Sequence, residues 1–276
     1  MDPTVFLTSA VVAAVVGGLV TYFGQRLLAE RQAHIDYESN ARKRLYEAIG
    51  PLRLQLLFAA RDLSSRVESH AEVKHWNMDP NEYYAKSFIY RILRPIAIGL
   101  LIERKMSVAD FAVDEGALGL LRFNTTAYRM LTGGQVILGH PGVDWRTQSQ
   151  HVFRDNLSAA AGVLITEQEE AGEVVMDFAK FSEIAIDSLN QTKLKPLENL
   201  FRRCDYSLLE NPILWTRLVG YGYACRQFVQ TYGTHLGFSA PEFPLVKLLG
   251  ETEDKHINER INDFPALLAG MVKQGL

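Results

Sequence analysis

The feature that most constrains this chain is an uncharged apolar stretch near its N-terminus. Residues 5–23, VFLTSAVVAAVVGGLVTYF, contain no charged side chain. As a helix rising about 1.5 Å per residue, the stretch is roughly 28 Å long, close to the thickness of the hydrocarbon core of a bilayer. Its small polar residues, Thr8, Ser9 and Thr21, can bond to their own helix backbone. We therefore expect a transmembrane anchor over residues 1–24.

Two other interpretations of this stretch fit the residues less well. A cleaved signal peptide would carry positive charge before a shorter apolar core, and the preceding residues MDPT contain no Lys or Arg. The first helix of a soluble domain would show a polar stripe. Basic residues follow the stretch instead, so the positive-inside rule predicts an N-terminus outside and a cytoplasmic body at a bacterial inner membrane. These residues are Arg26, Arg31, Arg42, Lys43 and Arg44.

The two ends of the expected span have different roles. Arg26 and Arg31 follow it closely and are placed to contact lipid headgroups, and Tyr22 and Phe23 sit where interfacial aromatic residues occur. Inside the span, small residues recur every four positions in two adjacent rows, which would let a second helix approach closely. The rows are Ser9, Ala13, Gly17 and Thr21, and beside them Ala10, Ala14 and Gly18. They predict a homo-oligomer, although small residues are also common in membrane helices that do not pair.

The rest of the chain is long enough for a real hydrophobic core. It has 276 residues, 47% of them hydrophobic, and a formal net charge of −3, which argues against an extended nucleic-acid surface. Cys204 and Cys225 are too few for a disulfide framework or a zinc site, and Cys225 is expected in the core. We expect no cofactor and no metal.

Helical spacing dominates the sequence after the span. We expect a juxtamembrane exit helix over residues 25–50 that stops or kinks at Gly50-Pro51, and a cytoplasmic helical domain over 51–276. The Gly-rich segment 132–144 could hold a short strand and divide that domain in two. Within the domain we expect helices at 51–67, 81–105 and 107–131, and one from Asp144 through 165. An acidic turn at 166–173, a helix after an Asp177 cap and an aromatic-rich core helix opened by Asn211-Pro212 follow. The fold class is all-α.

Only one spacing in the chain is typical of a catalytic site. Arg146 and His151 are separated by four residues, as in the HEPN ribonucleases, a class of helical domains that usually dimerise. A His there can transfer a proton at a ribose hydroxyl, and an Arg can stabilise the phosphate charge. HEPN motifs prefer Asn, Asp or His after the Arg, and this chain has Thr147. The simpler interpretation is that Arg146 is a surface residue and that His151 is a half-buried helix residue.

Two segments carry a resemblance to a known group of proteins. LYEAIGPLRLQLLFAARDLSSRV and HVFRDNLSAAAGVLITEQEEAGEVVMDFAKF resemble uncharacterised bacterial proteins with one N-terminal span and a helical cytoplasmic region. The resemblance implies the topology and no activity. A span followed by a HEPN-like domain is also similar to membrane-associated accessory proteins of RNA-targeting bacterial immune systems, which assemble in the membrane and disturb it.

The sequence therefore predicts a membrane-anchored, non-enzymatic assembly or effector protein with the lipid bilayer, a second copy of itself and a protein partner as its contacts. The alternative is a membrane-tethered ribonuclease that uses Arg146 and His151.

Overall fold

In the computed structural model, the described residues form helices, the loops that connect them and one small hairpin, which confirms the expected all-α class. The structure describes residues 3–72, 76–107, 114–170, 172–185, 188–202, 211–239 and 241–275, without the side chains of 3–16, 19–20, 115, 188–191 and 275. The elements are α1 (Pro3–Glu72), α2 (Tyr83–Met106), α3 (Glu115–Thr132), η2 (Gln135–Ile137), α4 (Arg154–Gly162), β1 (Ile165–Gln168), β2 (Gly172–Val175), α5 (Phe178–Ile184), α6 (Ser188–Phe201), α7 (Pro212–Gly233), η4 (Thr234–Leu236), α8 (Leu245–Gly250), α9 (Lys255–Glu259) and α10 (Phe264–Gly275).

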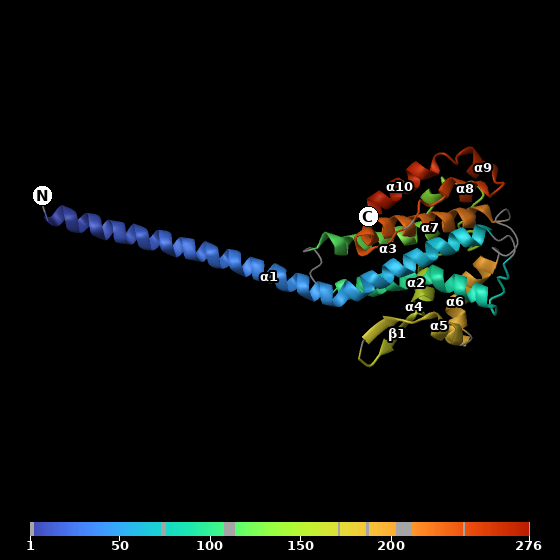
Figure 1. Cartoon of the computed structure of the whole chain (residues 1–276), viewed down its shortest axis with the longest axis horizontal. Coiled ribbons are helices and arrows are strands. Elements are labelled where there is room, and N and C mark those ends of the chain that lie inside the picture. Colours follow the sequence, from blue (N-terminus) through green and yellow to red (C-terminus); the bar gives the residue numbers. More distant parts are fainter. Residues whose placement is uncertain are drawn as a thin grey trace.

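Helix α1 is the longest element and has two different environments. Its N-terminal part extends far from the rest of the molecule as a single rod (Figure 1). Burial begins at Leu45 and Ile49, and from there the helix packs against α2 and α7. The same helix therefore supplies both the projecting rod and one wall of the core.

The expected stop at Gly50-Pro51 does not occur, because Pro51 lies inside α1. Proline removes the bond to the carbonyl of Glu47, and Glu47 is on the exposed side of the helix, where water can reach that carbonyl. Figure 1 shows α1 changing direction where it meets the body, as is usual near a proline. The alternative expectation of a kink is therefore the better description.

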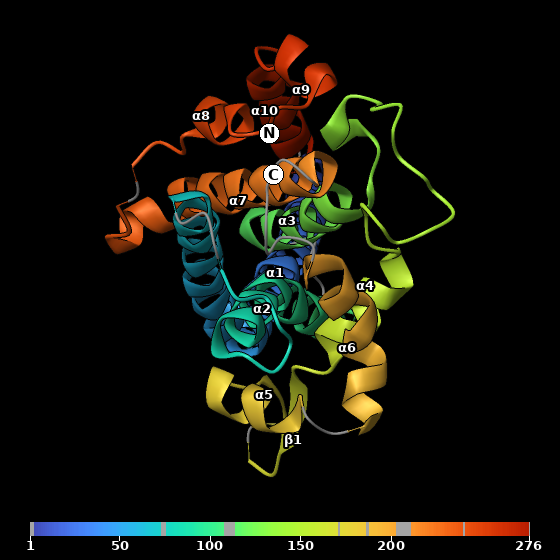
Figure 2. The same ribbon diagram turned by 90° about the vertical axis from the view of Figure 1, so that its right-hand side faces the viewer.

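The core is a bundle of α1, α2, α3 and α7 (Figure 2). Aromatic side chains of α7, among them Trp215, Tyr221 and Phe228, are fully buried, as the sequence predicted for this helix. Cys225 is also fully buried and free, whereas Cys204 lies outside the described residues. One hydrophobic cluster contains residues from both sides of segment 132–144.

Smaller elements cover the two sides of this bundle. Figure 2 shows α8, α9 and α10 on one side of α7, and α5 with the hairpin on the opposite side of the body. The N-terminus of α5 is capped as expected, since the Asp177 carboxylate accepts from the Lys180 N–H at 2.9 Å.

Three local expectations were wrong. The helix expected from Asp144 begins only at Arg154, because side chains in between satisfy the backbone in turns: Asp144 accepts from the Arg146 N–H at 3.0 Å, and Gln148 accepts from the Phe153 N–H at 2.8 Å. The acidic turn at 166–173 is an antiparallel hairpin of β1 and β2, with Gly172 at φ +68°. The strand suggested within 132–144 is instead the short helix η2.

Candidate functional site

The structure places Arg146 and His151 in different surroundings. Arg146 projects into solvent with 91% of its side chain exposed, and its Nε donates to Asp144 at 3.1 Å. His151 is only 2% exposed and packs between the rings of Trp145 and Phe153. Neither residue is helical, and no hydrogen bond joins the two side chains in the part of the chain that the structure describes. The helix-borne pair of a HEPN site is therefore not formed within this chain.

His151 is instead part of the packing around a buried arginine. Burial lowers the pKa of His151, and the nearby positive charge of Arg217 lowers it further. Arg217 is fully buried on α7 and donates to the backbone carbonyls of Gln150 at 3.0 Å, Met130 at 3.4 Å and Gly133. Burial lowers the pKa of Arg217 to about 10. This guanidinium fixes the segment between α3 and α4 onto the bundle, which is a structural role.

Two histidines, His140 and His256, lie where the loop after η2 meets α9. The Gly142 N–H donates to His140 Nδ1 at 3.0 Å, so the imidazole proton lies on Nε2 and is donated to Asp254 at 3.1 Å. Burial alone would raise the pKa of Asp254, but hydrogen bonds from Ile257 N–H and His140 hold it below its usual value. The His256 ring is 4.7 Å from that of His140, centroid to centroid. Across the described residues, no three or more His, Cys, Asp or Glu side chains are arranged to hold a metal ion.

Most residues of the expected transmembrane interface lie outside the described side chains, namely Ser9, Ala10, Ala13 and Ala14. The other three can be placed. Gly17 and Gly18 have no atom within 4 Å of where a Cβ would be, and the Thr21 hydroxyl donates to the Gly17 carbonyl at 2.8 Å. Among the residues that the structure describes, no helix is both long enough and apolar enough to cross a membrane.

The two arginines expected at lipid headgroups are exposed on the rod. Arg26 pairs with Glu30 one turn later, with Nε and Oε1 3.0 Å apart, and Arg31 faces solvent. Their positions leave both guanidinium groups accessible.

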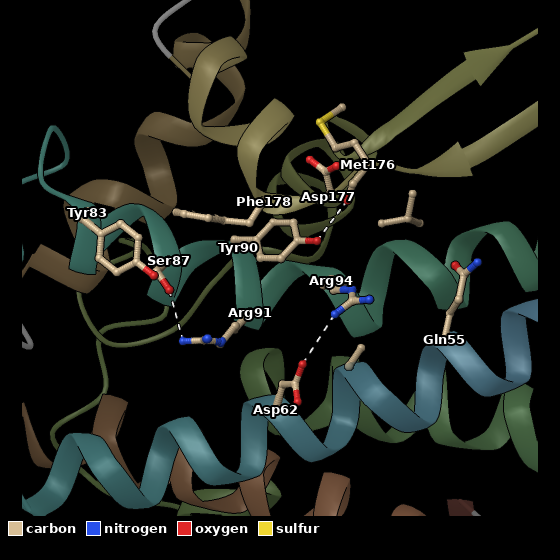
Figure 3. Close-up of a pocket in the computed structure, with 12 residues that line it drawn as sticks. Gln55, Asp62, Tyr83, Ser87, Tyr90, Arg91, Arg94, Met176, Asp177 and Phe178 are labelled. Carbon is tan, nitrogen blue, oxygen red and sulfur yellow. Dashed lines mark hydrogen bonds and ion pairs between the residues drawn. The ribbon is translucent and has the colours of Figure 1, made fainter.

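A cleft with polar and apolar walls lies along the seam between α1 and α2. Its volume is about 490 Å³, and the junction of β2 with α5 forms its third wall. On α1 it is lined by residues 55, 59 and 62, and on α2 by 83, 87, 90, 91 and 94, so each helix contributes one face at helical spacing. Figure 3 shows Arg91 and Arg94 reaching from α2 toward α1, with Phe178 and Met176 on the opposite wall.

Two guanidinium groups in this region converge on one hydroxyl. Ser87 Oγ accepts from Arg91 Nη1 at 3.1 Å and from Arg66 Nη2 at 3.3 Å. The Arg66 guanidinium also lies over the Tyr84 ring, 4.8 Å from its centroid. Among the described residues, neither Arg66 nor Arg91 forms an ion pair. Two like charges are thus close together, with a neutral oxygen between them.

The carboxylates nearby are already engaged. Asp62 lies 3.6 Å from Arg94 Nη1 and 2.9 Å from Arg61 Nη2, so two arginines share it. Asp177, on the third wall, caps α5. Tyr90 is fixed between the walls because its hydroxyl donates to the Met176 carbonyl at 3.0 Å. Burial raises the pKa of Tyr90, so the hydroxyl keeps its proton at neutral pH.

One feature of the sequence points to this cleft, namely two arginines within an apolar run. Arg91 and Arg94 interrupt the apolar run Phe88–Lys105, which excludes a second membrane span. In the structure, the interruption is one polar face of an otherwise buried helix. The partner face on α1 could not be inferred, because sequence does not show which helices pack side by side.

Comparison of the chain with protein-family models, with curated proteins and with solved structures gives no match.

Proposed function

We propose that this chain is a membrane-anchored, non-enzymatic assembly protein, which self-associates through residues 5–23 and presents its helical body to a protein partner on the cytoplasmic side. The observation that carries the proposal is the continuity of α1 from Pro3 to Glu72. Because no loop separates the apolar segment from the core, pairing at one end of the helix would orient the bodies at the other.

The rod between anchor and body has the chemistry of a helix that stands alone in water. Ion pairs one turn apart run along it, from Arg26 to Glu30 and from Glu38 to Arg42, and Gln32 donates to Asp36 at 2.9 Å. Such pairs each stabilise an exposed helix by roughly 0.2–0.5 kcal/mol. Local interactions therefore support a segment that packs on nothing else in Figure 1.

The rod also sets the distance between body and bilayer. Residues 24–44 at about 1.5 Å each give a spacer of roughly 30 Å. In this arrangement Arg26 and Arg31 lie at the headgroups. The body is farther from the bilayer than the screening length of salt, so the surface potential of the bilayer does not reach it. The body is then free to bind its partner without lying on the membrane.

The first experiment asks where the chain resides. Full-length protein is expressed in bacteria, and its membranes are washed with alkaline carbonate, which removes peripheral proteins. We expect the chain to stay in the membrane fraction. Val12→Arg places a charge at mid-span, at a cost of roughly 3 kcal/mol for insertion, and should shift the protein to the wash. Release of the unaltered chain by carbonate would contradict the anchor.

The second experiment tests self-association with a matched pair of variants. Gly17→Leu blocks close approach on the small-residue face, and Val15→Leu makes a similar change about 200° around the helix. Mass measurement of the detergent-solubilised chain should show an oligomer for the unaltered protein and for Val15→Leu, and a monomer for Gly17→Leu. An oligomer that survives in Gly17→Leu would exclude the span as its contact.

A further inference from the structure

The cleft between α1 and α2 is lined by two arginines and two aspartates, and further arginines lie beside it. Arg91 and Arg94 line the cleft, and Arg61 and Arg66 lie beside it. Asp62 pairs with Arg61 and Arg94, whereas no carboxylate of the described residues pairs with Arg66 or Arg91. Arg66 and Arg91 bond the same Ser87 oxygen, so their charges are about two hydrogen-bond lengths apart. Like charges at this separation repel each other unless an anion lies between or beside them.

From this arrangement we propose that the cleft binds a small phosphorylated ligand that carries a flat ring. A phosphate has several oxygen acceptors, and guanidinium groups bind it with paired N–H donors. Arg91 and Arg94 both line the cleft and are half-buried, so their donors face the cleft rather than the packed interior. The phosphate would lie beside Arg66 and Arg91, which pair with no carboxylate of the described residues.

The ring part of the ligand is inferred from the rim. Tyr83 is 67% exposed, and its ring meets Phe178 edge to face with centroids 5.4 Å apart. Phe178 also contacts Tyr90, at 5.5 Å between centroids. An exposed aromatic side chain next to a group of arginines offers one apolar surface for a ring and one charged surface for its phosphate.

The size and charge of the molecule favour a small ligand over a polymer. A cleft of about 490 Å³ falls in the range of small-molecule sites. The chain as a whole has a net charge of −3 and therefore lacks the positive field that would attract a nucleic acid.

The experiment is calorimetric titration of the full-length, detergent-solubilised chain with three probes: inorganic phosphate, phenyl phosphate and phenol. Ionic strength is held constant with NaCl, so that general screening is the same in every titration. We expect saturable binding of both phosphates, tighter for phenyl phosphate, and none for phenol. Absence of saturable binding by either phosphate would overturn the proposal.

Three variants assign the binding to these residues. Arg91→Gln should weaken both phosphates about tenfold, since it removes one charge-assisted contact. Arg129→Gln, at an exposed position on α3 away from the cleft, should bind like the unaltered chain. Tyr83→Ala should abolish the advantage of phenyl phosphate over phosphate.

Other results would count against the site. Equal affinity in Arg91→Gln and the unaltered chain would place any phosphate elsewhere, and equal affinity for both phosphates would remove the ring from the proposal. If circular dichroism shows Arg91→Gln to be unfolded, Arg91→Lys keeps the charge and should weaken phosphate less. The titration needs neither a bilayer nor an oligomer, so its failure and a failure of membrane anchoring can be told apart.

Discussion

Replacing Arg217 by Met tests the idea that one buried guanidinium holds the long segment between α3 and α4 in place. Met keeps an unbranched apolar stem of similar length and removes every donor. The carbonyls of Met130, Gly133 and Gln150 then lose the guanidinium that now serves all three. The Arg217 guanidinium also lies 5.7 Å from the ring centroid of Trp145, a contact that disappears with the charge.

The expected loss can be worked from opposing contributions. Burial lowers the pKa of Arg217 to about 10, which corresponds to a burial cost of roughly 3 kcal/mol. Hydrogen bonds from a charged donor contribute about 1.5–3 kcal/mol each, so three of them exceed that cost. Met escapes the burial cost but leaves three acceptors without a donor, two of them partly open to water. We expect a net loss of about 3 kcal/mol in the free energy of unfolding, a large share of the 5–15 kcal/mol typical of a domain.

Urea unfolding followed by tryptophan fluorescence is the appropriate assay, since Trp145 lies in the segment and Trp215 in the core next to it. Far-ultraviolet circular dichroism is less informative, because the rod of α1 adds helix signal that does not depend on the core. Arg129→Met, exposed on α3, is the control and should change stability little. Arg217→Lys should recover only part of the loss, because one ammonium cannot reproduce the planar array of donors. A loss below about 0.5 kcal/mol for Arg217→Met would refute the reasoning.

Two further predictions use the same unfolding assay. Burial and the Arg217 charge lower the pKa of His151, so the unfolded chain binds a proton at about pH 6.5 that the folded chain resists; stability should be full above that pH and fall as the pH decreases below it. In His151→Gln the stability should fall less, and in the control His34→Gln, at an exposed position, it should fall as much as in the unaltered chain. Gly220→Ala would place a Cβ 2.8 Å from Val136 Cγ2 and should cost about 1–3 kcal/mol, whereas the Cβ of Gly162→Ala would meet no atom within 4 Å, and that variant should lose nothing.

Local sequence rules were reliable where the structure depends on neighbours along the chain. The aromatic spacing of residues 212–233 predicted a core helix, and α7 is buried along most of its length. The Asp177 cap also depends on contacts within one turn, and it is present. Periodicity and capping are local properties, so they were visible without the fold.

The same rules failed where side chains compete with the backbone. The side chains of Asp144, Thr147 and Gln148 hydrogen-bond to nearby groups and form turns. Helix α4 therefore begins after these residues, although the apolar spacing that follows them is helical. His140 and His256 are more than a hundred residues apart in the sequence, so their spacing gives no sign that the fold brings their rings together. The α1–α2 cleft has the same origin, since its two faces are far apart in sequence.

The two proposals meet in α1. The helix that would pair in the membrane also contributes Asp62 and Arg66 to the cleft region, and no break separates the two parts. A ligand between α1 and α2 could therefore affect pairing only by changing how α1 sits against α2, with the bend near Pro51 as the place where such a change would be absorbed.

Thermodynamic linkage makes this reciprocal: if phenyl phosphate shifts the monomer–oligomer equilibrium by some factor, assembly must shift its affinity by the same factor. Titrating phenyl phosphate into Gly17→Leu and Val15→Leu compares the two assembly states directly. Equal affinities would show that anchor and cleft act independently.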